Sequence, residues 1–236
     1  MPDAEMRLSE AVSLVQAAQD AGATLRLLGG IAAALHSGSL TSGRPHREFG
    51  DIDSITRRRD VGAVVRALRN HGFEPDGRFN ALNAGHRLIF YGPPGKLDVF
   101  VNNFEMCHRL ELSERLLLDS PTLTVSDLLL TKLQVVELTE KDVADLELLL
   151  KAHEVGESEG DVINAPYIAR LLARNWGLWR TVTRNLERLA GLDSVVDARG
   201  ERLLNVIAAA PRTSGFRLRA VLGERKRWYE LPEEVG

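Results

Sequence analysis

The hydrophobic pattern of the first half of the chain changes repeatedly between a helical and an extended period. Apolar residues three and four positions apart predict helices, whereas short apolar runs bounded by glycines predict strands. In chain order these patterns predict a helix over 8–21, a strand over 24–28, a helix from Ile31, a strand over 50–55 and a helix between its cap Asp60 and Gly72. Two further runs, 87–91 and 96–101, are joined by Gly-Pro-Pro-Gly and predict a hairpin. The segments 109–112 and 116–119 are expected to add a second hairpin or a strand at the sheet edge.

From Thr124 onward the pattern is helical only. Apolar positions at helical spacing predict helices over 124–138, 140–150, 167–189, 201–209 and 216–228. The stretch 153–164 is polar, acidic and contains glycines, which is typical of a linker. We therefore expect an α+β fold, with a small mixed sheet and flanking helices, followed by a C-terminal helical region. The predicted domains are 1–152 and 165–236, separated by the linker.

The composition of the chain excludes several classes of protein. The chain has 236 residues, of which 44% are hydrophobic, so it can bury one large core or two modest ones. No run of about 18 apolar residues could cross a bilayer, and the first residues lack the basic-then-apolar order of a signal peptide. We expect a cytoplasmic protein with no membrane partner. The single cysteine, Cys107, excludes an internal disulfide and a cysteine-based zinc site, and it is expected to be a buried apolar residue.

The net charge of −3 hides an asymmetry between the two parts of the chain. Residues 164–236 hold 13 Lys and Arg against 8 Asp and Glu, a net charge of +5, which leaves −8 for residues 1–163. The arginines of the C-terminal helices could bind RNA, or they could be the solvated faces of ordinary helices. The tryptophans there are expected to be core anchors, with stacking on nucleic-acid bases as the alternative: Trp176, Trp179 and Trp228.

Three aspartates form the strongest chemical pattern. Successive side chains of a strand point to opposite faces, so Asp51 and Asp53 place two carboxylates on the same face. Asp98 interrupts the apolar run 97–101, where a carboxylate needs a metal, a cationic partner or a water-filled cleft. We favour the metal, because the three carboxylates together would offer the hard oxygen ligands that suit Mg²⁺.

Other residues could bind an anion near these aspartates. Gly29 and Gly30 let the backbone turn sharply between strand and helix, and the N–H groups at a helix start favour a phosphate. The loop 37–50 carries side chains that could neutralise phosphates, or that could be ordinary loop charges: Arg44, His46 and Arg47. Lys132 could reach a triphosphate, and Asp142 could act as a base or fix a basic side chain, although each alone is typical of a helix surface.

These motifs together resemble the signature of the DNA polymerase β-type nucleotidyltransferase superfamily. The resemblance rests on Leu28-Gly29-Gly30, on Asp51-Ile52-Asp53 and on Asp98 within an apolar strand. Leu130-Thr131-Lys132-Leu133 and the stretch 140–146 resemble the lysine and lysine-aspartate helices of minimal branches, which include aminoglycoside and abortive-infection toxin-type nucleotidyltransferases of prokaryotes. The resemblance covers residues 24–150. The spacing from Gly30 to Asp51 is longer than in minimal members, which implies an insertion.

The resemblance implies a Mg²⁺-dependent enzyme that moves an NMP from an NTP, ATP among them, to a hydroxyl of an unidentified small molecule, RNA or protein. In such a site two Mg²⁺ ions are held by Asp51, Asp53 and Asp98, and Asp98 is the candidate to accept the hydroxyl proton. The nucleotide-binding residues expected on this basis are Gly29, Gly30, Arg47, Lys132 and Asp142. Two alternatives stay open: a non-catalytic module that binds nucleotide or RNA, and a toxin–antitoxin component that modifies tRNA.

Overall fold

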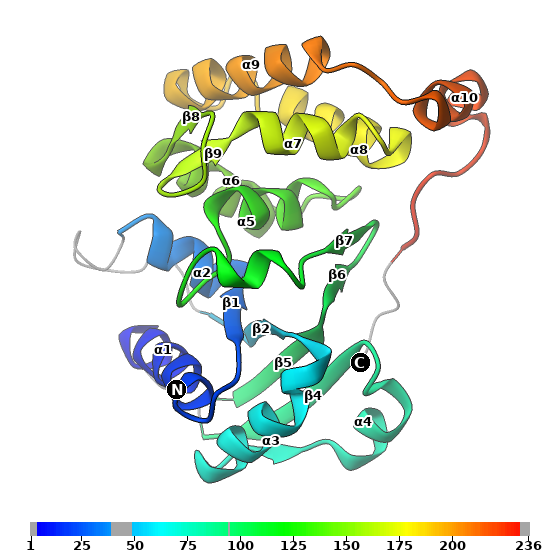
Figure 1. Ribbon diagram of the computed structural model, residues 1–236. Helices are drawn as coiled ribbons and strands as arrows, with labels where there is room; N and C mark the ends of the chain where they lie inside the picture. Colours follow the sequence, from blue (N-terminus) through cyan, green and yellow to red (C-terminus); the bar gives the residue numbers. More distant parts are fainter. Residues whose placement is uncertain (1–3, 39–48, 94, 232–236) are drawn as a thin grey trace. The chain divides into compact units, whose positions relative to one another are not determined.

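A computed structural model describes residues 4–38, 49–93 and 95–231 of the chain (Figure 1). The chain forms two compact units. The first unit contains residues 1–104 and 110–124, and the second contains residues 105–109 and 125–236. The division near residue 124 differs from the domain boundary expected after residue 152. The helices between these two positions pack with the C-terminal helices, because their apolar faces form one core with them.

The first unit is built on a five-stranded mixed sheet with the strand order β1-β2-β5-β4-β3. The strands are β1 (Leu25–Leu28), β2 (Ile52–Thr56), β3 (Glu74–Pro75), β4 (Arg87–Gly92) and β5 (Gly95–Val101). β2 and β5 run parallel, and every other neighbouring pair in this sheet is antiparallel. The predicted hairpin is confirmed as β4–β5. Together with the helices, this sheet confirms the predicted α+β class.

The described residues of the first unit form the helices α1 (Ala4–Asp20), α2 (Gly29–His36), α3 (Val61–Asn70) and α4 (Gly77–Asn83). α1 packs against β1 and α3, and α2 contacts β1 and β2. α2 begins at Gly29 rather than at Ile31, so both glycines form its first turn. Asp60 precedes α3 but its side chain does not cap it. Its carboxylate instead accepts hydrogen bonds from Arg57 Nε at 2.8 Å and Thr24 N at 3.2 Å.

Of the two segments expected to form strands after β5, one does so. β7 (Arg109–Glu111) pairs with β6 (Asn103–Glu105), which the sequence pattern did not predict. The segment 116–119 is not a strand, because residues Arg115–Leu117 form a 3₁₀ turn. Beyond that turn the backbone of residues 121–123 lies along β1. Leu27 N donates to Pro121 O at 2.9 Å, and Leu123 N donates to Leu27 O at 3.0 Å. This segment covers the outer edge of β1.

The second unit is helical around a central buried helix. Its helices are α5 (Val125–Leu133), α6 (Glu140–Ala152), α7 (Ala165–Leu172), α8 (Trp176–Arg188), α9 (Ser194–Ala209) and α10 (Ser214–Leu222). Almost every residue of α5 is buried, and α5 contacts α6, α7 and α8. The stretch expected to be a linker holds β8 (Glu154–Gly156) and β9 (Val162–Asn164), which pair in parallel. None of the helices in the described ranges is both long and apolar enough to cross a membrane.

Helix boundaries in the second unit differ from the predictions where the side chain of a polar residue caps the start of a helix. The helix predicted over 167–189 is two helices, because the Asn175 side chain accepts from Leu178 N and starts α8. α9 begins earlier than residue 201, since Asp193 caps it by accepting from Val195 N and Val196 N. α10 ends at Leu222, before Gly223 with φ +53°, so Trp228 lies outside a helix.

Candidate functional site

Asp53 and Asp98 lie side by side in the sheet of the first unit. β2 and β5 pair in parallel, with Asp53 opposite Asp98. Paired positions on neighbouring strands are about 4.8 Å apart and carry their side chains on the same face. Asp51 comes directly before β2, two residues from Asp53, rather than within the strand. The structure therefore brings together the carboxylates that the sequence pattern singled out.

Gly29 lies against the carboxylate of Asp53. β1 ends at Leu28, which pairs with Asp53 across the sheet, and Gly29 follows as the first residue of α2. Gly29 is buried and has φ +72°, a backbone conformation that residues other than glycine rarely adopt. A Cβ atom at Gly29 would lie 2.4 Å from Asp53 Oδ2. Glycine is therefore required both by the backbone conformation and by the close approach of this carboxylate.

We expect Gly29→Ala to destabilise the fold and to displace the Asp53 carboxylate. Gly22→Ala is the matched control, because Gly22 has φ +73° and nothing lies within 4 Å of its added Cβ. Backbone strain of this kind costs about 1–3 kcal/mol in either variant. Urea unfolding should show a larger decrease in the free energy of unfolding for Gly29→Ala than for Gly22→Ala. Titration with Mg²⁺ and ATP should show weakened binding for Gly29→Ala alone. Equal behaviour of the two variants would mean that Gly29 serves the turn and not the carboxylate.

Asp98 is buried and has cationic partners. Its side chain is 2% exposed, and Oδ1 lies 3.0 Å from Arg87 Nε and 2.9 Å from Arg87 Nη2. Its other oxygen, Oδ2, lies 3.3 Å from Lys96 Nζ. The Arg87 guanidinium also lies 5.1 Å from the centre of the Phe100 ring, which fixes its plane. The cationic partner, which the sequence analysis ranked below a metal, is thus present for both oxygens of Asp98.

Lys96 also reaches Asp51. Its ammonium nitrogen lies 3.5 Å from Asp51 Oδ2, so it bridges the carboxylates of Asp51 and Asp98. The Asp51 side chain is 47% exposed, so this end of the group faces solvent. Sequence reasoning missed both Lys96 and Arg87. Strand alternation could have indicated Lys96, because a residue two positions before Asp98 shares its face.

The three aspartates fit a Mg²⁺ ion by the chemistry of their ligands. They offer the hard carboxylate oxygens that this ion prefers. In the described part of the chain, the oxygens of Asp51, Asp53 and Asp98 do not all lie within 4.8 Å of one another. The Lys96 ammonium lies between the carboxylates of Asp51 and Asp98.

The other predicted nucleotide-binding residues lie elsewhere in the chain. Gly30 is the half-buried second residue of α2. Arg47, with its neighbours Arg44 and His46, falls outside the described residues. Lys132 and Asp142 belong to the second unit, where Lys132 Nζ lies 2.9 Å from Asp142 Oδ1 and 2.9 Å from Asp145 Oδ2.

The ion group of Lys132, Asp142 and Asp145 joins α5 to α6. Burial opposes the charged form of Lys132, but the carboxylates of Asp145 and Asp142 outweigh it and raise the pKa of Lys132. Burial would raise the pKa of Asp142, but Lys132 and hydrogen bonds from Thr139 hold it below its usual range. Asp142 and Thr139 also form a capping box at the start of α6. These contacts give Asp142 a structural role in addition to the predicted nucleotide contact.

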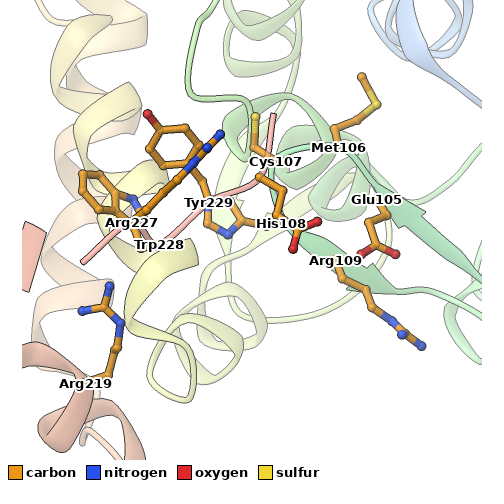
Figure 2. A pocket seen from close by; sticks show the side chains of 10 residues that line it. Glu105, Met106, Cys107, His108, Arg109, Arg219, Arg227, Trp228 and Tyr229 are labelled. Atoms are coloured by element: carbon orange, nitrogen blue, oxygen red, sulfur yellow. The ribbon is translucent and has the colours of Figure 1, made fainter. Parts of the chain in front are cut away.

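A separate cavity of about 410 Å³ lies in the second unit, as Figure 2 shows. Residues 105–109, Arg219 and residues 227–230 line it. At its wall, His108 Nε2 lies 2.8 Å from Thr181 Oγ1, which also accepts from Trp228 Nε1 at 3.2 Å. Burial lowers the pKa of His108 to about 4, so the ring is neutral at pH 7. The threonine hydroxyl has one proton and two lone pairs, so it can accept from the indole and either donate to His108 Nε2 or accept from it.

The C-terminal strap, residues 226–231, forms one side of this cavity. Lys226 O accepts from Arg219 Nη2 at 2.6 Å, and Glu230 N donates to Cys107 O at 3.1 Å. A Cβ atom at Gly177 would lie 2.8 Å from the carbonyl oxygen of Trp228. The strap therefore packs directly on α8 at Gly177.

We expect Gly177→Ala to loosen the strap. Glycine to alanine within a helix normally stabilises a protein by about 0.5–1 kcal/mol. Gly200→Ala in α9 is the matched control, because nothing lies within 4 Å of its added Cβ, and it should raise the melting temperature. Gly177→Ala should lower the melting temperature and speed tryptic cleavage after residues 225–227. A rise in melting temperature for both variants, with unchanged cleavage, would contradict close packing of the strap.

Comparisons with known proteins give distant structural likenesses. No family model matches the chain, and no curated protein matches it in sequence. The chain is similar to the lincosamide antibiotic adenylyltransferase LnuA with lincomycin bound, at 17% identity and a TM-score of 0.45, over 60% of this chain and 94% of that one. It is also similar to the antibiotic-resistance factor ANT(2'')-Ia, at 14% identity and a TM-score of 0.42, over 70% and 95% of the two chains.

A third similar structure is an antigenic nucleotidyltransferase-like protein from Paracoccidioides brasiliensis, at 15% identity and a TM-score of 0.45. That likeness covers 91% of this chain and 97% of the other. Two of the three proteins carry names of the nucleotidyl- or adenylyltransferase class, which is the class that the sequence resembles. At these levels of identity and TM-score, function is to be inferred from the geometry of the site.

Proposed function

We propose that this chain is a nucleotidyltransferase that moves an NMP from an NTP to a hydroxyl group of an acceptor, with Mg²⁺ held by Asp51, Asp53 and Asp98. One observation carries this proposal. Asp53 and Asp98 are paired on neighbouring strands, and the backbone of Gly29 lies directly against Asp53. The hard oxygens of these carboxylates suit a divalent cation, and the start of α2 beside them suits a phosphate.

The residues of the site have separate roles in such a transfer. Bound Mg²⁺ supplies Lewis-acid stabilisation of the charge on the reacting phosphate and the departing pyrophosphate. Gly29 and Gly30 present the N–H groups of the α2 start to the phosphates. Asp98 is held at Oδ1 by Arg87, which fixes the orientation of its carboxylate. We keep Asp98 as the candidate to take up the proton of the acceptor hydroxyl once Lys96 has left Oδ2.

The acceptor is proposed only as a class, a hydroxyl of a small molecule, an RNA or a protein. Several arginines of the second unit are engaged within it. Arg180 Nε lies 2.6 Å from Glu224 Oε1, Arg219 donates to backbone carbonyls, and the Arg212 guanidinium lies 5.3 Å from the Trp179 ring centre. These contacts leave fewer cations for an RNA backbone than the sequence count indicated. A small-molecule hydroxyl is therefore the first acceptor to test, followed by tRNA.

Calorimetric titration of the full chain with each NTP in the presence of Mg²⁺ tests the proposal. The wild type should bind at least one NTP, and Asp51→Asn/Asp53→Asn should lose that binding because it removes two of the three metal-ligand charges. Asp20→Asn, an exposed aspartate on α1, is the control and should bind as the wild type does. Nucleotide binding without pyrophosphate release across an acceptor panel would favour the non-catalytic module. Failure of the wild type to bind any NTP would overturn the proposal.

A further inference from the structure

We propose that Lys96 is a resident counter-cation of the aspartate group, which gives way to the metal and then contacts a phosphate of the bound nucleotide. This inference rests on the proposed function and concerns how the same site is loaded. It starts from the position of the Lys96 ammonium, 3.3 Å from Asp98 Oδ2 and 3.5 Å from Asp51 Oδ2. These are carboxylates to which we assign Mg²⁺, so lysine and metal compete for the same oxygens.

The two cations at Asp98 are held in different ways. Arg87 makes two contacts to Oδ1, and its guanidinium lies over the Phe100 ring, so its orientation is fixed by three interactions. Lys96 makes longer contacts through a single ammonium at the end of a flexible four-carbon stem. The exposed fractions of the two side chains, 23% for Lys96 and 25% for Arg87, are nearly equal, so the difference lies in the contacts. Arg87 should therefore keep its contacts with Asp98 when a metal binds, whereas the Lys96 ammonium should leave its carboxylate partners.

The charges of the group support the same exchange. A divalent ion bound to Asp51 and Asp98 while Lys96 stays in place would lie within a few ångströms of the ammonium, and the two cations would repel each other. The metal-bound nucleotide brings a triphosphate to the site, and this is a favourable new partner for the displaced ammonium. Lys96 is thus a positioning residue that makes metal binding depend on the nucleotide.

Lys96→Gln distinguishes this role from a structural one, with Mn²⁺ as a spectroscopic probe read by electron paramagnetic resonance. Without nucleotide, the variant should bind Mn²⁺ about tenfold more tightly than the wild type, because the competing charge is gone. With Mn²⁺ present, the variant should bind α,β-methylene-ATP about tenfold more weakly, because the phosphate contact is lost. Lys226→Gln, which removes a lysine of the strap, is the control and should change neither affinity.

The directions in which Lys96→Gln changes the affinities for Mn²⁺ and for α,β-methylene-ATP distinguish the proposed role from a structural one. A merely structural lysine would weaken both affinities, and equal affinities for wild type and variant would likewise overturn the proposal while leaving the proposed function intact. If neither protein binds Mn²⁺, with or without nucleotide, the proposed function fails and this inference fails with it.

A second measurement follows Lys96 directly. The chain has five lysines, so reductive ¹³C-methylation gives a spectrum with few signals, and the Lys96 signal is identified by its absence in Lys96→Gln. It should shift when Mg²⁺ is added together with α,β-methylene-ATP, and it should not shift in Asp51→Asn/Asp53→Asn. A Lys96 signal that stays unchanged while the wild type binds metal and nucleotide would overturn the exchange.

Discussion

Asp53→Asn should lower the rate of nucleotidyl transfer by about three orders of magnitude or more, which is the scale of losing a main electrostatic contact in an active site. Asparagine has nearly the same shape as aspartate, so the contact with Gly29 is kept while the charge is lost. The free energy of unfolding should change little, since Asp53 is half-buried and its charge lies next to that of Asp98. Removing one of two neighbouring like charges does not by itself destabilise a fold.

The measurement is the transfer of label from an α-labelled NTP to the acceptor found for the wild type, with circular dichroism on the same samples. Asp53→Glu is a useful companion variant, because it keeps the charge but moves the carboxylate by one methylene group. Its rate should also fall, since the space beside Gly29 is already filled. Loss of secondary structure in Asp53→Asn would point to a structural network in place of a metal site.

Lys132→Met should destabilise the second unit by about 3–5 kcal/mol, the usual cost of removing one partner from a buried ion group. The variant would leave Asp145, which is 1% exposed, without the cation that lies 2.9 Å from it. Lys151→Met is the matched control. Lys151 also contacts two carboxylates, those of Glu147 and Asp193, but it is largely exposed, so its removal should matter little.

Urea unfolding of both variants at pH 7 measures this difference. A stable Lys132→Met protein that no longer binds nucleotide would show that Lys132 serves the ligand and not the fold. An unstable protein would show that the contact with Asp142 and Asp145 holds α5 to α6, whatever else Lys132 does.

The same ion group should make stability depend on pH in a defined window. The folded-state pKa of Asp142 is lowered, so its contribution is present above its unfolded value and is lost as the pH falls through the folded value. The folded-state pKa of Lys132 is raised, so its contribution is present below its unfolded value and is lost as the pH rises through the folded value. The contribution of these two groups to the free energy of unfolding of the wild type should therefore be constant between about pH 4 and 10 and shrink outside that range, which urea unfolding over this range measures.

The sequence pattern placed Asp53 and Asp98 within strands, as the structure has them, but Asp51 lies before β2 rather than within it. Asp53 and Asp98 could be expected on one face because a carboxylate within an apolar strand is unusual and two such strands of one sheet often become neighbours. The partners of Asp98 could not be predicted in the same way. Arg87 lies on the adjacent strand, and its contact depends on the hairpin register that places Arg87 opposite Phe100. Packing between the strands of a sheet fixes this register. The hydrophobic pattern of one strand does not show which residue of the next strand lies opposite.

Helix ends and the division into units were harder to predict, for a different reason. Asn175 and Asp193 start helices by accepting backbone hydrogen bonds, but apolar spacing continues across such caps and hides them. The helices α5 and α6 carry a resemblance to nucleotidyltransferase motifs, yet they pack with the C-terminal helices. Local periodicity gives the buried face of a helix but not the element that covers it.

The parallel pairing of β2 with β5 has a consequence for how the protein folds. Asp53 and Asp98 are separated in the chain by α3, β3, α4 and β4, whereas β4 and β5 are joined by a short turn. Local hairpins close quickly, and pairings that span many residues form late because the chain must first lose the entropy of a long loop. The carboxylates of the proposed metal site therefore meet only after β4 and β5 have formed. A chain in which β2 and β5 have not paired offers no such site, so the metal binding that we propose depends on this pairing.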